Sequence, residues 1–233
     1  MESLTVLNSV SPEVAPAPAR RGFTLVEMLV VLGIIAIISA IAVTGQSTYN
    51  QNLLLTNTAY TVAFSAREAQ SFGLSSRKFG SVQNPGYGLH FDRALPSSYL
   101  LFADISKTLA APSSCPLGTI GAPDQKPGNC VYDSAAPADG IQETFNFSRG
   151  FTIQSFCGVA GAVTYCSTDS TPLSTLDMVF TRPNTSSTIS GTRSGSRVEF
   201  TCAQMTITDA SRVATKTVRV SKLGEISIGQ VCS

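Results

Sequence analysis

The pattern of hydrophobic and polar positions divides the chain into a polar start, an apolar run and a long mixed remainder. Residues 1–22 are mostly polar and contain Pro12, Pro16 and Pro18, so they predict an unstructured leader. Residues 23–43 are apolar apart from one charged residue, Glu27. About twenty apolar residues in a helix are long enough to cross a bilayer. The run therefore predicts a transmembrane segment over 23–43.

The pattern becomes amphipathic after residue 43. Apolar and small residues such as Leu54, Val62 and Ala69 recur at steps of three and four, and polar residues lie between them. No proline occurs from Phe23 to Lys78. This spacing is typical of a helix with one buried face, so we expect one long helix whose second half, 44–78, packs on a folded domain.

Short alternating segments after residue 79 predict β-strands. They lie at 87–91, 99–103, 143–147, 151–156, 176–181, 197–202, 205–208, 217–220 and 225–228. Residues 109–140 show no periodicity and are rich in Ala, Pro and Gly, which indicates either an exposed functional loop or a disordered insertion. The predicted fold is α+β: a long N-terminal helix, its first half transmembrane, packed on an antiparallel sheet within a β-rich domain over 79–233.

The charges around the apolar run indicate processing. Arg20 and Arg21 precede it, which favours a cytoplasmic N-terminus. Glu27 lies within it, where a carboxylate costs about 2.5–3.5 kcal/mol and usually has a partner. Cleavage between Gly22 and Phe23 would create an α-amino group four residues before Glu27. That amine, on the same chain or on a neighbouring helix, would compensate the carboxylate.

The heptad Arg21-Gly22-Phe23-Thr24-Leu25-Val26-Glu27 resembles the cleavage and methylation motif of type IV pilins and type II secretion pseudopilins. The resemblance implies that a prepilin peptidase cuts after Gly22 and methylates Phe23. It also implies that Glu27 registers each subunit against its neighbour in a filament. The implied partners are other pilin subunits, an inner-membrane assembly platform and membrane lipid. The implied location is a single pass through the inner membrane, with the folded domain in the periplasm.

Two further segments are similar to GspH/FimT minor pilins. They are the hairpin that begins at Tyr87-Gly88-Leu89-His90-Phe91 and the closing segment 218–226. Some FimT-like proteins bind DNA through a Gly-Arg-x-Arg motif, but this chain has Gly224-Glu225-Ile226-Ser227 there. Phosphate contacts require positive charge rather than a fixed sequence, so other basic residues stay candidates for nucleic-acid binding. They are Arg193, Arg197, Arg212, Lys216, Arg219 and Lys222. Solvated strand edges are the simpler interpretation of these charges, because the net charge is only +1.

An ordinary export signal is the alternative to the pilin interpretation. Arg20-Arg21-Gly22-Phe23 also resembles a twin-arginine signal, and Ala40-Ile41-Ala42 offers small residues for cleavage. The product would be a soluble periplasmic protein. However, the apolar part of a secretory signal has about 7–15 residues, and this run is longer and begins with an acid.

Six cysteines follow the apolar run, and an even number on the exported side indicates disulfides. Fifteen pairings are open, and spacing favours Cys115–Cys130, Cys157–Cys166 and Cys202–Cys232.

Catalytic signals are few. The single histidine, His90, lies in a predicted strand and favours a structural role. No Cys-x-x-Cys pair, phosphate loop or His-Glu-x-x-His motif occurs. We therefore expect a structural subunit with no catalytic residues, no metal site and no cofactor.

Overall fold

A computed structural model describes residues 22–75, 77–118 and 126–232, and only the backbone of residues 43–48. The predicted leader lies outside the described residues, except for Gly22. The longest element is helix α1 (Leu25–Leu74), which continues without interruption through 50 residues. The chain divides into two compact units, 1–47 and 48–233.

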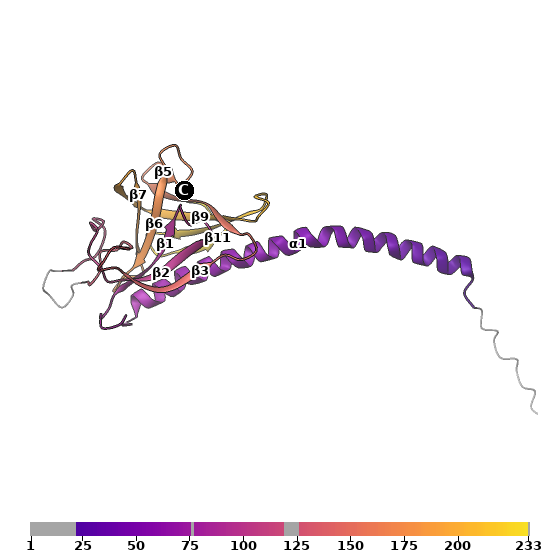
Figure 1. The fold of residues 1–233 in the computed structure, drawn as a ribbon, viewed down its shortest axis with the longest axis horizontal. Helices are drawn as coiled ribbons and strands as arrows, with labels where there is room; N and C mark the ends of the chain where they lie inside the picture. The colour runs from indigo at the N-terminus through magenta and orange to yellow at the C-terminus, as the bar shows by residue number, and fades with distance from the viewer. Residues whose placement is uncertain (1–21, 76, 119–125, 233) are drawn as a thin grey trace, which may run out of the picture. The chain divides into compact units, whose positions relative to one another are not determined.

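The second unit contains two antiparallel sheets (Figure 1). The first has six strands in the order β3-β2-β1-β6-β7-β8. Their bounds are β1 (Gly86–Asp92), β2 (Ser98–Asp104), β3 (Gly140–Asn146), β6 (Leu173–Phe180), β7 (Ser187–Arg193) and β8 (Ser196–Phe200). The second sheet has five strands in the order β11-β10-β9-β4-β5. Their bounds are β4 (Thr152–Ala160), β5 (Val163–Cys166), β9 (Cys202–Thr208), β10 (Thr215–Ser221) and β11 (Ile226–Ile228).

One hydrophobic core joins both sheets to the second half of α1, which runs alongside the strands in Figure 1. The helix contributes mainly small side chains, including Ala59, Ala63, Ala66 and Ala69, all fully buried. Small residues let the helix approach the strands closely. The approach is close at Gly73, since an added Cβ would lie 2.2 Å from the Phe180 carbonyl oxygen. The predicted α+β, pilin-like fold class is confirmed.

The sequence pattern does not predict two of the strands, β5 and β7. β7 contains Ser, Thr and Gly with a single large apolar residue, Ile189, and therefore does not resemble a buried strand, although most of it is buried. It is buried because it lies between β6 and β8 in the sheet. β5 has only four residues and pairs with β4 across a turn in which Gly161 has φ of 61°.

The predicted strand 197–202 is wrong at its end. β8 stops at Phe200, and Cys202 begins β9, which belongs to the other sheet. The chain crosses between the sheets at Thr201, whose backbone N–H and side-chain hydroxyl both donate to the Val159 carbonyl oxygen, at 2.8 Å and 3.1 Å. The alternating pattern runs through this crossing, so it does not mark the change of sheet.

Candidate functional site

Helix α1 begins with a capped first turn. The Glu27 backbone N–H donates to Thr24 Oγ1 at 3.2 Å, and the Met28 N–H donates to the Thr24 carbonyl oxygen at 3.2 Å. Thr24-Leu25-Val26-Glu27 has the Thr-x-x-Glu spacing of a capping box. A carboxylate in the first turn also interacts favourably with the positive end of the helix dipole. Glu27 therefore lies where the helix itself tolerates a negative charge, four residues after Phe23.

The helix surface that follows is apolar and exposed. Leu25–Ala42 is long and apolar enough to cross a membrane, and none of it is buried by the rest of the chain. Eighteen helical residues extend about 27 Å, close to the thickness of a bilayer core. Glu27 is the only charged residue within Gly22–Ala42. An apolar surface of this length requires lipid or protein around it.

Residues 18–43 match the family described as the prokaryotic N-terminal methylation motif. This segment is a prepilin-type signal. It implies processing by a prepilin peptidase and assembly with other pilins, and it supports a type IV pilin-like subunit. Proteins with this motif are structural subunits. Comparison of the chain with curated proteins and with solved structures gave no match.

The exposed apolar helix is consistent with a single-pass inner-membrane anchor of such a subunit. Gly22 and Phe23, the predicted processing residues, lie just before the helix begins, and both are exposed. Arg20 and Arg21 lie outside the described residues.

Three disulfides join all six cysteines of the second unit. The pairs are the same ones that spacing favours: Cys115–Cys130, Cys157–Cys166 and Cys202–Cys232. Cys157 and Cys166 lie opposite each other on β4 and β5. Cys202–Cys232 fixes the end of the chain to β9, where the Cys232 N–H also donates to Gln204 Oε1 at 2.8 Å.

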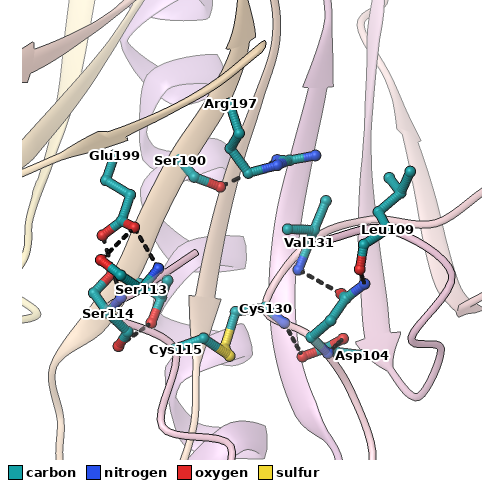
Figure 2. Close-up of a disulfide and its surroundings, with 12 residues drawn as sticks. Asp104, Leu109, Ser113, Ser114, Cys115, Cys130, Val131, Ser190, Arg197 and Glu199 are labelled. Atoms are coloured by element: carbon teal, nitrogen blue, oxygen red, sulfur yellow. Dashed lines mark hydrogen bonds between the residues drawn. A yellow bond between two sulfur atoms is a disulfide. The ribbon is translucent and has the colours of Figure 1, made fainter. Parts of the chain in front are cut away.

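The Cys115–Cys130 disulfide closes the long segment between β2 and β3, and a buried carboxylate holds it to the sheet (Figure 2). Asp104, at the end of β2, accepts hydrogen bonds from the Asn129 N–H at 2.9 Å and the Cys130 N–H at 2.7 Å. Burial, together with the nearby Asp139 carboxylate, raises the pKa of Asp104 to about 8, although the two N–H donors lower it.

A second buried carboxylate organises the other side of the same segment. Asp139 accepts from the backbone N–H groups of Ile105, Ser106 and Asp133, at 2.7, 2.7 and 2.8 Å. Burial raises the pKa of Asp139 despite these donors. No group of histidine, cysteine and carboxylate side chains in the described ranges could hold a metal ion. These acids thus anchor the loop backbone.

Glu199 on β8 anchors the part of the loop before Cys115 (Figure 2). Its carboxylate accepts hydrogen bonds from the Ser113 and Ser114 backbone N–H groups and from the Ser113 hydroxyl. Partial burial would raise the pKa of Glu199, but these serine donors outweigh burial and lower it. The loop is thus fixed to β2 at one end and to β8 at the other.

His90 lies beneath this loop on β1. Its Nδ1 is 2.6 Å from Asp177 Oδ1 on β6, and Arg197 Nη1 on β8 donates to Asp177 Oδ2 at 3.2 Å. Asp177 is only 1% exposed, and these two partners contact both oxygens of its carboxylate. The Tyr132 ring, from the loop, packs on the His90 ring with centroids 4.4 Å apart. His90 therefore joins the sheet to the loop.

The candidate nucleic-acid residues are distributed over both sheets. Arg193 and Arg197 lie on β7 and β8, Lys216 and Arg219 on β10, and Arg212 and Lys222 in the turns at its two ends. Arg197 is paired with Asp177, and Arg219 Nη1 donates to Glu225 Oε2 at 3.1 Å. Arg193 Nε donates to the Thr171 carbonyl oxygen at 2.9 Å. Three of the six thus have intramolecular partners.

No local signal in the sequence predicts the cluster of His90, Asp177 and Arg197. Asp177 falls within the predicted strand 176–181, and Arg197 is predicted only as a candidate for nucleic-acid binding. Strand alternation indicates which side chains of one strand share a face, but it carries no information on which strands are neighbours. The register that puts His90 opposite Asp177 is set by the pairing of β1 with β6.

Proposed function

We propose that this chain is a minor pilin or pseudopilin of the GspH/FimT type, which assembles into, or primes, a type IV pilus or a type II secretion pseudopilus. One observation carries the proposal. A prepilin-type methylation motif stands at the head of an exposed apolar helix segment, and the only charge of that segment, Glu27, lies in its first turn.

The proposed mechanism of assembly depends on charge compensation away from water. Cleavage after Gly22 leaves an amine on Phe23. Two opposite charges about 4 Å apart attract each other by about 1 kcal/mol in water and several times more strongly in a medium of low dielectric constant. Glu27 of an incoming subunit would therefore select a neighbour that presents a Phe23 amine. Contacts between the apolar segments then bury the surface that lipid covered before assembly.

The membrane orientation follows from the same end of the chain. Arg20 and Arg21 hold the N-terminus in the cytoplasm, and the domain with the three disulfides lies in the periplasm, which is oxidising. The proposed boundaries are the cleaved leader 1–22, the transmembrane half 23–43, the amphipathic half 44–78 and the periplasmic domain 79–233. The partners are the prepilin peptidase, other pilin subunits and an inner-membrane assembly platform.

Glu27→Ala tests the role of the carboxylate. Its removal lowers the cost of membrane insertion, so the subunit should remain inserted and folded. Incorporation into filaments, measured by immunoblot of sheared fibres, should be lost. Glu68→Ala is the matched control, since Glu68 is an acid of the same helix within the second unit. Normal incorporation of the Glu27→Ala protein would refute the proposed role.

Gly22→Ala tests the processing site. A side chain at this position should block the peptidase, and the protein should keep its leader, visible as a band about 2 kDa heavier. Gly33→Ala is the control, because an added Cβ at Gly33 meets no atom within 4 Å. Normal processing of the Gly22→Ala protein would contradict the assignment of the motif.

DNA uptake is not part of the proposal. Glu225 and Ser227 stand where DNA-binding relatives have arginines, and Glu225 pairs with Arg219 across the same hairpin. A carboxylate at this position repels phosphate, which disfavours a phosphate contact by Arg219.

A further inference from the structure

The outer face of the six-stranded sheet carries two rows of polar side chains. Each row crosses four neighbouring strands and takes one residue from each strand. The first row runs from His90 on β1 through Asp177 on β6 and Ser190 on β7 to Glu199 on β8. The loop covers this row at both ends, because Tyr132 packs on His90 and the serines at 113 and 114 bind Glu199.

The second row lies beside the loop and is open. It consists of Asp92 on β1, Thr175 on β6, Thr192 on β7 and Arg197 on β8, which are register neighbours across the four strands. Strands are about 4.8 Å apart, so the row is about 14 Å long. All four side chains line a groove of about 400 Å³, a volume typical of small-molecule sites.

Hydrogen-bonding capacity is available in this groove. No hydrogen bond joins the Thr175 or Thr192 hydroxyl to any other group of the described residues, although each hydroxyl can donate one bond and accept two. Asp92 provides an acceptor at one end, and Arg197 provides donors at the other. Arg197 itself is held in place by Asp177 and Ser190, each at 3.2 Å (Figure 2 shows the bond to Ser190).

Apolar surface flanks the polar row. Leu95, in the turn after β1, is 55% exposed, and Leu109, in the disulfide loop, is 47% exposed; both line the groove together with Tyr132. The acidic side chains of the groove are Asp92 and Asp177, and its one guanidinium belongs to Arg197. This set gives no excess of positive charge, so the groove does not suit phosphate or another strong anion.

We propose that this groove binds a short, uncharged oligosaccharide. Sugar hydroxyls both donate and accept hydrogen bonds, as the row of Asp92, Thr175, Thr192 and Arg197 requires. The C–H faces of sugar rings are apolar and fit against Leu95, Leu109 and Tyr132. The floor is preorganised by the buried His90–Asp177–Arg197 cluster, so binding does not need to order it. The site is independent of the N-terminal helix and of the proposed assembly.

The test is calorimetric titration of the full-length protein, solubilised in a detergent without a sugar headgroup. The probes are cellotriose, maltotriose and triacetylchitotriose, with a heparin tetrasaccharide and single-stranded DNA for comparison. We expect at least one neutral trisaccharide to bind with Kd of about 1 mM or below. The double variant Thr175→Val/Thr192→Val removes two hydroxyls without changing side-chain shape, and should weaken binding at least about 10-fold.

Thr164→Val is the matched control, because Thr164 is an exposed threonine on β5 in the other sheet. It should bind like the wild type, and circular dichroism should show the same fold for all variants. Three results would overturn the proposal. The first is that no neutral trisaccharide binds at a concentration of about 10 mM, which is 10-fold above the expected Kd. The second is equal binding by the wild type and the double variant, and the third is binding of the anionic probes alone.

Discussion

The buried carboxyl group of Asp104 should make the stability of the disulfide loop depend on pH. Asp104 is 2% exposed and receives two backbone N–H donors from the loop, yet burial and the neighbouring Asp139 raise its pKa to about 8. Its ordinary value is 3.8. Asp104 therefore keeps its proton in the folded protein over a pH range in which the unfolded chain has already lost it.

The sign and the size of the effect follow from this difference. Because the folded pKa lies above the unfolded one, the contribution of Asp104 to stability is fully present below pH 4. It is lost as the pH rises towards 8, and above pH 8 both states are ionised, so the loss stops growing. Each tenfold change in proton concentration across this range corresponds to about 1.4 kcal/mol, which gives a total of about 6 kcal/mol, and about 5 kcal/mol of it falls between pH 4 and pH 8.

Urea unfolding of the full-length protein, followed by circular dichroism at pH 4, 6 and 8, measures the effect. Asp104→Asn removes the titrating group, although its amide leaves one loop N–H without an acceptor and costs about 1–3 kcal/mol at pH 4. The free energy of unfolding of the wild type should fall by about 5 kcal/mol more than that of the variant between pH 4 and pH 8. Asp169→Asn is the control, because Asp169 is exposed and accepts a single N–H. Parallel pH profiles for wild type and Asp104→Asn would refute the reasoning.

Three substitutions test other parts of the fold by thermal and urea unfolding. Gly73→Ala places a Cβ 2.2 Å from a backbone carbonyl oxygen of β6 and should destabilise the protein by about 1–3 kcal/mol; an unchanged midpoint would contradict the close approach. Replacing both Cys115 and Cys130 by alanine should lower the free energy of unfolding by about 3 kcal/mol, and no change would mean that the loop is ordered without its disulfide. Arg197→Ala leaves the buried Asp177 carboxylate with one partner and should lower the free energy of unfolding by about 3 kcal/mol. Asp177→Asn in the same chain should partly restore this stability. If it does not, the loss comes from altered packing and not from the unpaired carboxylate.

The elements with strong local signals were predictable. The apolar run and the proline-free amphipathic segment predict α1, and its observed bounds, Leu25–Leu74, are close to the expected 23–78. The hairpin β1–β2 was also predictable, since both strands are short segments rich in apolar and aromatic residues and are bounded by glycine and proline. These signals are local, because they depend on residues within a few positions of one another.

The parts that depend on long-range pairing were not predictable. β7 has a polar composition and is recognisable only from its place between β6 and β8. The change of sheet at Thr201 occurs within one continuous alternating segment. The polar row from Asp92 to Arg197 spans more than a hundred residues of sequence, and only the register of four strands brings it together.

The mature N-terminus is the direct test of the central claim. Intact mass and N-terminal sequencing of the protein from native membranes should give a chain that begins at N-methylated Phe23 and retains the apolar segment Leu25–Ala42. A chain that begins near Val43 would mean that the apolar segment is an ordinary secretory signal and that the domain is released as a soluble protein. That result would contradict assembly through Glu27.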